Sequence, residues 1–181
     1  FKMKTETHWQ DVFKVVIKET DFILEILDAR NPEGTHNLMI EKFVKRNRPS
    51  VQTFLVINKI DIIPHAILLQ WKNFYENQGY RVYYVSARYN RGVKYLLKDL
   101  RRIVSRSHTN ILIVGYPNTG KSTIIEALCE GTKKAGVSAF AGFTRAIKKI
   151  KLNDKIFLID TPGVIPIDET DETELAIKSC M

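Results

Sequence analysis

The sequence has few of the residues that build disulfide frameworks or metal centres, and no long apolar run. Its two cysteines, Cys129 and Cys180, lie far apart, and its four histidines follow no metal-ligand spacing, so neither a disulfide nor a structural zinc site is indicated. No apolar run approaches the roughly 20 residues that span a bilayer, and no signal segment opens the chain. We therefore expect a cytoplasmic protein without a membrane partner.

The composition points instead to one ordinary domain with an excess of positive charge. The 181 residues, 44% of them hydrophobic, suffice for a single core. The formal net charge of +8 favours a polyanionic partner, because lysine and arginine gain affinity by releasing counterions from phosphates. Charge alone is weak support for nucleic-acid binding, since many basic domains bind none.

Strand-like and helix-like segments alternate along the chain. Short apolar runs end near Asp28, Ile57, Val85, Val114 and Ile159. The first four are each followed by a segment whose apolar residues recur at helical spacing. This alternation is typical of the α/β class with a doubly wound, mostly parallel sheet, in which ligands bind at the carboxyl ends of the strands.

The chain falls into three parts. Residues 1–20 carry apolar side chains at helical spacing and are expected to form an amphipathic helix packed on the domain. Residues 21–166 form the main domain; within it, residues 132–145 show no periodicity, and residues 147–159 are expected to form two strands joined by a tight turn. An acidic run within residues 167–181 suits the start of a helix, so we expect a C-terminal helical segment there that the sequence cuts short.

A phosphate-binding loop lies between the fourth strand and its helix. Residues 115–122 read Gly-Tyr-Pro-Asn-Thr-Gly-Lys-Ser, which matches Gly-x4-Gly-Lys-Ser in the context that this motif requires. Its glycines let backbone N–H groups converge on phosphates, Lys121 neutralises the β and γ oxygens, and the Ser122 hydroxyl ligates Mg²⁺. The residues expected to contact the nucleotide here are Tyr116, Pro117, Asn118, Thr119, Gly120, Lys121, Ser122 and Thr123.

A second group of candidate residues would sense the γ-phosphate. Asp160 ends the last strand, where its carboxylate can reach the magnesium shell, and the Gly163 N–H can meet the γ-phosphate. Thr144 is placed to add a second hydroxyl to Mg²⁺ and to leave when the γ-phosphate is gone. We thus predict Lys121, Thr144 and Gly163 as catalytic residues, and Ser122, Thr144 and Asp160 as magnesium ligands. Both an ordinary turn at residues 160–163 and an ordinary loop threonine stay open.

Two short motifs earlier in the chain would select the base. In Asn58-Lys59-Ile60-Asp61, the aspartate can accept from guanine N1–H and N2–H₂ together, whereas adenine offers no such pair of donors. Asn58 can bridge the base and the phosphate loop, and the aliphatic stem of Lys59 can cover the base. Ser86-Ala87-Arg88 would complete the pocket with the Ala87 N–H directed at guanine O6, although this tripeptide alone carries little information.

The motifs resemble those of GTPases related to translation factors, but their order differs. Residues 58–61 and 86–88 precede the phosphate loop, whereas the usual arrangement places that loop first. The sequence from about residue 21 to about residue 166 resembles the circularly permuted GTPases of the YlqF/RbgA type, and residues 27–32 are similar to that family's Asp-Ala-Arg signature. The resemblance implies a permuted P-loop (Ras-like) fold, hydrolysis of GTP to GDP, and a role in assembly of the large ribosomal subunit.

The resemblance also bears on the rate of hydrolysis. Asn118 resembles the asparagine that ligates K⁺ in potassium-activated members, while it could equally serve only to shape the loop. Val164 stands where signalling GTPases place the glutamine that orients water, so we expect slow intrinsic turnover that a partner stimulates. A nucleotide-gated RNA-binding or protein-binding module with negligible hydrolysis is the alternative, and the oligomeric state stays open.

The partner implied by the resemblance is ribosomal RNA or a pre-ribosomal particle, and the basic residues are candidates for contacting it. An equally weighted interpretation is that lysines on an outer strand protect its edge against pairing. The basic residues gather in three groups: Lys42, Lys45, Arg46 and Arg48; Arg101, Arg102 and Arg106; and Arg145, Lys148, Lys149, Lys151 and Lys155.

Overall fold

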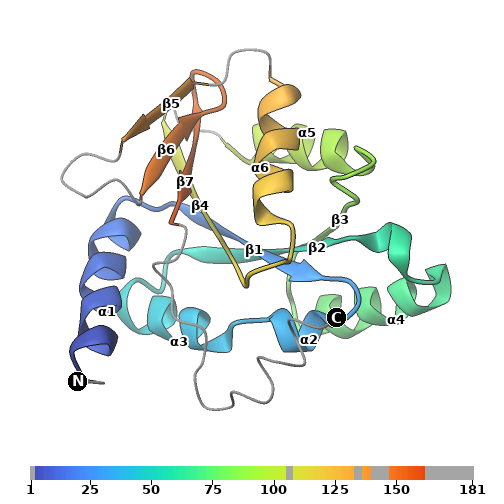
Figure 1. The fold of residues 1–181 in the computed structure, drawn as a ribbon, viewed down its shortest axis with the longest axis horizontal. Helices are drawn as coiled ribbons and strands as arrows, with labels where there is room; N and C mark the ends of the chain where they lie inside the picture. Colours follow the sequence, from blue (N-terminus) through green and yellow to red (C-terminus); the bar gives the residue numbers. More distant parts are fainter. Residues whose placement is uncertain (1–2, 105–107, 133–135, 140–146, 162–181) are drawn as a thin grey trace.

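The computed structural model describes residues 3–104, 108–132, 136–139 and 147–161, which form a sheet covered by helices (Figure 1). Strands and helices alternate through most of this part of the chain. The elements are α1 (Met3–Lys18), β1 (Phe22–Asp28), α2 (Pro32–Thr35), α3 (Leu38–Asn47), β2 (Gln52–Asn58), a 3₁₀ turn (Ile60–Ile62), α4 (His65–Glu76), β3 (Val82–Tyr84), α5 (Val93–Ile103), β4 (Thr109–Gly115), α6 (Lys121–Glu130), β5 (Gly136–Ala139), β6 (Lys148–Lys151) and β7 (Ile156–Asp160).

Within the described residues, seven strands form one sheet in the order β3-β2-β1-β4-β7-β6-β5. The pairs β1–β2, β1–β4, β2–β3 and β4–β7 are parallel, whereas β6 pairs antiparallel with both β7 and β5. The predicted α/β class with a mostly parallel sheet is therefore confirmed. Because the strand order reverses around β1 and β4, the carboxyl ends of these strands and their neighbours form the edge at which ligands bind in such sheets.

Alternating side chains of the central strands face two different helix layers. Leu24 and Ile26 of β1 pack with α5 and α6 in one buried cluster, whereas Ile23 packs with α1 and α3 in another. This division follows from the two-residue period of a strand, and it explains why β1 is a nearly continuous apolar run. From the amphipathic first helix, Phe13 and Val16 are fully buried in the second cluster. Figure 1 shows α5 and α6 on one side of the sheet and α3 and α4 on the other.

Two elements differ from the sequence-based expectation. Residues 136–139, expected to lie in a stretch without periodicity, form β5, the edge strand beside β6. Four residues are too few for periodicity to be visible, and their pairing with β6 is tertiary. In the helical segment expected after the run ending near Ile57, which forms α4, the apolar residues at helical spacing are only partly buried: Tyr75 is buried, while Ile67 and Phe74 are 38% and 42% exposed. In the described part of the chain, no helix is long and apolar enough to cross a bilayer.

Candidate nucleotide-binding site

The phosphate loop connects β4 to α6 and depends on two residues with left-handed backbone conformations. These are Asn118, with φ of 67°, and Gly120, with φ of 87°. A Cβ atom at Gly120 would overlap the side-chain amide of Asn58, so this position requires glycine for both backbone and space. Within the loop, the Thr119 hydroxyl donates to the Tyr116 carbonyl at 2.8 Å. Thr119 is buried and thus shapes the loop, whereas Pro117 and Asn118 are exposed.

Asn58 joins the three sequence motifs to one another. Its Nδ2 donates to the Thr119 carbonyl at 2.9 Å, and its Oδ1 accepts from the Ala87 N–H at 3.1 Å. The side chain therefore reaches the phosphate loop, as we expected. The Ala87 N–H, expected to face guanine O6, is instead bonded to Asn58 in the structure. Since Asn58 is buried, both of these hydrogen bonds are shielded from water and hold the loops in one arrangement.

Asp61 is held by a neighbour on the adjacent loop. The hydroxyl of Ser86, which is fully buried, donates to Asp61 Oδ1 at 2.7 Å. This bond fixes one carboxylate oxygen and so orients the exposed carboxylate toward a pocket of about 350 Å³. The lining residues are Asn58, Lys59, Asp61, Ile62, Ser86, Arg88, Gly120 and Thr123. The tripeptide 86–88 looked nearly uninformative in sequence because its role depends on this cross-loop contact.

Asp28 contacts the candidate site through Lys59, and sequence reasoning gave it no role beyond its place in the Asp-Ala-Arg signature. Lys59 has a left-handed backbone, and its Nζ donates to Asp28 Oδ2 at 2.9 Å and to the Asn118 carbonyl. Arg30 also binds both carboxylate oxygens of Asp28, at 3.0 and 2.8 Å. Burial tends to raise the pKa of Asp28, but the hydrogen bonds from Arg30 and Lys59 outweigh it and lower this pKa. Asp28 therefore anchors the Lys59 head, so that its stem extends along the phosphate loop.

The position of Asp28 at the end of an apolar run is the one feature of the sequence that bears on this role. Asp28 and Asn58 are register partners at the ends of the parallel strands β1 and β2. Side chains that follow such strand ends meet at the same sheet edge. Sequence alone gave no pairing of β1 with β2, so the contact between Asp28 and Lys59 could not be derived from it.

On the other side of the loop, Lys121 lies beside Asp160. Its Nζ is 2.8 Å from Asp160 Oδ1, and both side chains are largely buried. Lys121 opens α6 and Asp160 ends β7, which pairs with β4, so two adjacent strands bring them together. Ser122 follows in the first turn of α6. A hard carboxylate and a hydroxyl beside an ammonium group suit a magnesium ion with phosphate oxygens. Thr144, Gly163 and Val164 lie outside the described residues.

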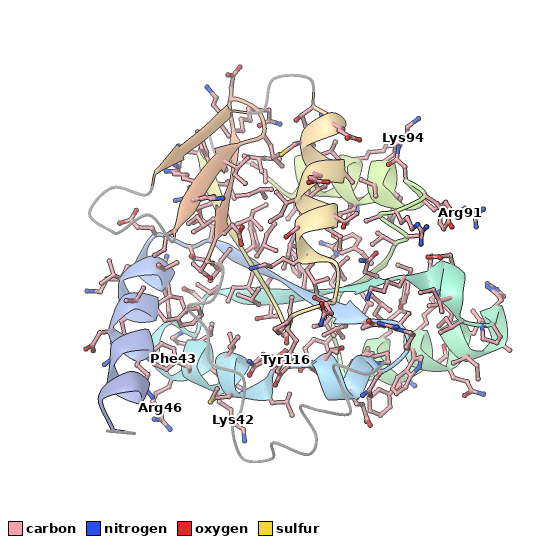
Figure 2. All side chains as sticks on the ribbon, viewed as in Figure 1. Lys42, Phe43, Arg46, Arg91, Lys94 and Tyr116 are labelled. Carbon is pink, nitrogen blue, oxygen red and sulfur yellow. The ribbon has the colours of Figure 1, made fainter. Side chains whose placement is uncertain are left out.

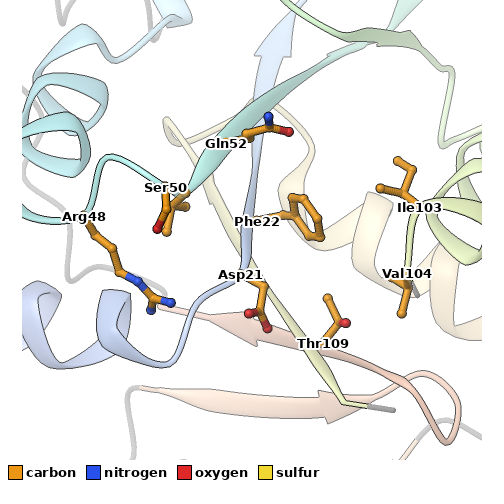
Figure 3. Close-up of a pocket in the computed structure, with 9 residues that line it drawn as sticks. Asp21, Phe22, Arg48, Ser50, Gln52, Ile103, Val104 and Thr109 are labelled. Atoms are coloured by element: carbon orange, nitrogen blue, oxygen red, sulfur yellow. The ribbon is translucent and has the colours of Figure 1, made fainter. Parts of the chain in front are cut away.

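A second pocket, of about 360 Å³, lies at the opposite edge of the sheet, at the amino ends of β1, β2 and β4 (Figure 3). Its polar groups are used in holding the chain together. The Arg48 guanidinium donates to the Ile17 carbonyl at 2.7 Å, and Asp21 Oδ2 accepts from the Asn110 N–H at 2.8 Å. The edge with the phosphate loop is therefore the better candidate for the functional site.

Comparison with known proteins agrees with this geometry. Residues 110–180 match the family model of the 50S ribosome-binding GTPases. A solved YlqF structure with GDP bound superposes with a TM-score of 0.66 at 28% identity, covering 91% of this chain and 63% of that one. YlqF from T. maritima with GNP bound gives a TM-score of 0.65 at 27% identity, covering 92% and 62%. This chain belongs to the circularly permuted P-loop GTPases of the YlqF type.

The curated relatives are also GTP-binding proteins by name. An uncharacterised GTP-binding protein of Methanocaldococcus jannaschii is 38% identical over 92% of this chain. Nucleolar GTP-binding protein 2 of Saccharomyces cerevisiae is 32% identical over 96% of it. The chain spans only 43% and 36% of these two proteins. Since one relative is named nucleolar, the cytoplasmic location expected from the sequence stays a prediction.

Proposed function

We propose that this YlqF-type chain binds GTP with Mg²⁺, hydrolyses it to GDP and phosphate, and acts as a switch in assembly of the large ribosomal subunit. The observation that carries the proposal is the convergence of three separate motifs on one pocket. Asn58 links residues 86–88 to the phosphate loop, and Ser86 holds Asp61 at the pocket wall. The ribosomal role rests on the family to which the chain belongs.

Guanine selectivity follows from Asp61. Its carboxylate can accept from guanine N1–H and N2–H₂, whereas adenine would leave the carboxylate oxygens unsatisfied. Rejection of this kind reaches about 10⁴-fold in sites built for hydrogen bonding. We expect Asp61→Asn to reduce the preference for GTP over ATP strongly, as measured by competition with a fluorescent GDP analogue. Asp154→Asn is the matched control, because the Asp154 side chain is 95% exposed in the turn between β6 and β7. Unchanged discrimination in Asp61→Asn would refute the base assignment.

The catalytic part of the site would act mainly through charge. Bound Mg²⁺ supplies positive charge to the β and γ oxygens, and Ser122, Asp160 and Thr144 are the residues proposed to hold it. The Lys121 ammonium, now 2.8 Å from Asp160, is placed to neutralise the oxygens that gain charge as the bond to the γ-phosphate breaks. The Gly163 N–H is proposed to contact the γ-phosphate. Water then attacks in line, and GDP leaves with the bridging oxygen.

Water activation is the weak part of this site. An apolar side chain at residue 164 cannot orient water, so we expect slow intrinsic turnover that is stimulated by the ribosomal particle. Phosphate release measured with and without large-subunit particles tests this expectation. Rates that no particle changes would favour the alternative, a nucleotide-gated binding module with negligible hydrolysis.

A potassium ion held by Asn118 would add positive charge at the same place. Asn118 is exposed and has a left-handed backbone, and its carbonyl accepts from Lys59. Turnover measured in KCl and in NaCl tests the idea, and equal rates would remove it.

Co-sedimentation with large-subunit particles in the GTP-analogue and GDP states tests the ribosomal role itself, with binding expected in the GTP-analogue state.

A further inference from the structure

The outward surface of α5 and of the turn before it is both basic and aromatic. We call this surface the α5 face. Tyr89 and Tyr95 on it are 56% and 65% exposed. Of the phenylalanine, tyrosine and tryptophan side chains that the structure describes, Phe74 is the other exposed one, and it lies on α4. The exposed cations of the α5 face are Arg88, Arg91, Lys94, Lys98, Arg101 and Arg102.

The helical part of the α5 face is a single stripe. At 3.6 residues per turn, the exposed positions 94, 95, 98, 101 and 102 fall within an arc of about 120°. The opposite side of α5 is buried in the core through residues such as Leu96 and Leu100. Figure 2 shows Arg91 and Lys94 projecting outward from this side of the molecule, far from Lys42 and Arg46 on α3.

Within residues 88–102, the α5 face exposes almost no negative charge. All residues from 88 to 102 are described, and the one acid among them, Asp99, is only 5% exposed. Asp99 accepts from the Tyr83 hydroxyl and from Arg102, and these bonds, that from Tyr83 foremost, lower its pKa. Arg102 is therefore partly neutralised, while the remaining cations of the α5 face meet no acid within this segment. A polyanion approaching it meets net positive charge.

Both tyrosine rings contact a neighbouring side chain. Tyr95 lies 6.3 Å from the ring of Tyr83, which is itself buried and bonded to Asp99. The Arg88 guanidinium lies over the Tyr89 ring, 5.5 Å from its centroid. Exposed rings among cations are the combination that binds single-stranded nucleic acid, because bases stack on the rings while cations contact phosphates.

The other basic groups lack this combination. On α3, Arg48 is used to bind the Ile17 carbonyl. On β6, Lys149 lies over the ring of Phe157, and Lys151 pairs with Asp154 at 3.4 Å. The expectation that lysines here protect a strand edge does not fit β6, because β5 lies outside it. Among the described side chains, neither group carries an exposed phenylalanine, tyrosine or tryptophan, and the exposed ring beside β6, that of His108, has one side stacked on Phe157 at 4.2 Å.

We propose that the α5 face binds a single-stranded segment of ribosomal RNA, with bases stacked on Tyr89 and Tyr95 and phosphates at the surrounding cations. The proposal rests on the function proposed above and names the surface through which the RNA is held. A duplex keeps its bases stacked on one another, so it could use the cations but not the rings. Single-stranded RNA is therefore the ligand that uses both features.

The α5 face is connected to the nucleotide pocket through one tight turn. Ser86 and Arg91 exchange two backbone hydrogen bonds, both of 3.0 Å, and Gly92 follows with φ of 75°. The same Ser86 holds Asp61, and Arg88 lines the guanine pocket. RNA bound at Tyr89 and nucleotide bound beside Ser86 would thus contact two sides of the same turn. Because binding free energies are reciprocal, a change in RNA affinity with bound nucleotide requires the matching change in nucleotide affinity with bound RNA.

The first test compares Tyr95→Ala and Tyr95→Phe with the unchanged chain, using a fluorescent 12-nucleotide single-stranded RNA and a duplex of the same length. We expect Tyr95→Ala to weaken single-strand binding roughly tenfold and to leave duplex binding unchanged, because stacking on a ring is lost. Tyr95→Phe keeps the ring and should bind as the unchanged chain does. Binding of fluorescent GDP, expected to be equal in all three, shows that the fold and the pocket are intact.

A second test separates charge from stacking. Lys94→Glu combined with Lys98→Glu should reduce the salt dependence of single-strand binding by about 1.4 in the slope of log affinity against log salt, as two lost phosphate contacts predict. Lys45→Glu on α3 is the control and should leave the slope unchanged. Equal single-strand affinity of Tyr95→Ala and the unchanged chain would overturn the proposal, as would an unchanged slope in the Lys94 and Lys98 variant.

Co-sedimentation with large-subunit particles separates this proposal from the proposed function. If the unchanged chain binds particles and the Tyr95→Ala variant binds them equally well, the α5 face is not the RNA contact. If the unchanged chain does not bind particles while Tyr95→Ala still weakens oligonucleotide binding, the RNA surface stands and the ribosomal role fails.

Discussion

Replacing Gly120 with alanine would place a methyl group against Asn58 Nδ2 and force a side chain into a backbone conformation with φ of 87°. The overlap is with a buried amide that makes two hydrogen bonds, rather than with the free end of a flexible side chain. Asn58 would have to move, and its bonds to Thr119 and Ala87 would break. The substitution thus tests whether the link between the base motifs and the phosphate loop carries the stability and affinity that the geometry suggests.

The expected cost has two parts. A non-glycine residue in the left-handed region costs about 1–2 kcal/mol. Each of the two lost hydrogen bonds costs about 1 kcal/mol, and more where a buried group is left unsatisfied. Gly120→Ala should therefore lower the free energy of unfolding by about 3–4 kcal/mol. Because the displaced Asn58 no longer holds the phosphate loop, GDP affinity should also fall at least tenfold.

Gly79 offers a matched control. Its φ of 88° is nearly the same as that of Gly120, but a Cβ atom there would meet nothing within 4 Å. Gly79→Ala should thus cost only the backbone part, about 1–2 kcal/mol, and leave GDP binding unchanged. Urea unfolding and titration with fluorescent GDP measure both quantities. Equal losses of stability in the two variants, with GDP affinity intact in Gly120→Ala, would refute the role of Asn58 as the link.

Three further substitutions test neighbouring parts of the structure. Asp28→Asn should weaken GDP binding several-fold, because Asp28 positions Lys59. The folded pKa of Asp28 is lowered, so its contribution to stability is present above about pH 4 and is lost as pH falls through the folded pKa. The unfolding midpoints of the variant and the unchanged chain should therefore converge in acid. Ser86→Ala should lower the preference for guanine over adenine nucleotides without abolishing GDP binding, which competition titration would show. Glu25, a fully buried residue of β1, has its pKa raised by burial and then by repulsion from Glu41. Its contribution to stability is therefore present below its unfolded pKa and lost as pH rises through the folded one. Glu25→Gln should gain stability relative to the unchanged chain as pH rises through the folded pKa of Glu25, and a difference in thermal midpoint that stays constant with pH would contradict this.

The fold was predictable wherever local pattern and burial agree. The run that ends at Asp28 is apolar because β1 is buried on both faces, and β2 and β4 follow the same rule. β5 was not predictable, because its four residues gain their structure by pairing with Lys148–Lys151. The exposure of Ile67 and Phe74 on α4 was missed for a related reason: helical spacing shows which residues share a face, but not how much of that face a short neighbouring strand such as β3 can cover.

The site was predictable where a motif is contiguous in sequence and less so where it is assembled in space. The residues of the phosphate loop were identifiable from Gly120 and Lys121, because the spacing alone implies the loop. The contacts from Ser86 to Asp61 and from Lys59 to Asp28 join positions 25 and 31 residues apart. Such contacts depend on which strands become neighbours, and this information is not local.

The permuted order also determines the sequence of events during synthesis. β1 takes β2 as one neighbour and β4 as the other, but β4 begins at Thr109, long after β1 ends at Asp28. At translation rates of about 5–20 residues per second, the β4 side of β1 stays without its partner for several seconds after β1 has been made. Late in that interval, once residue 88 has been made, the nascent chain holds both base-recognition motifs but not the phosphate loop at residues 115–122, so GTP or GDP has no phosphate contacts through which to help it fold. β1, an interior strand of the finished sheet, is thus transiently an edge strand, with the exposure to wrong pairing that edges carry.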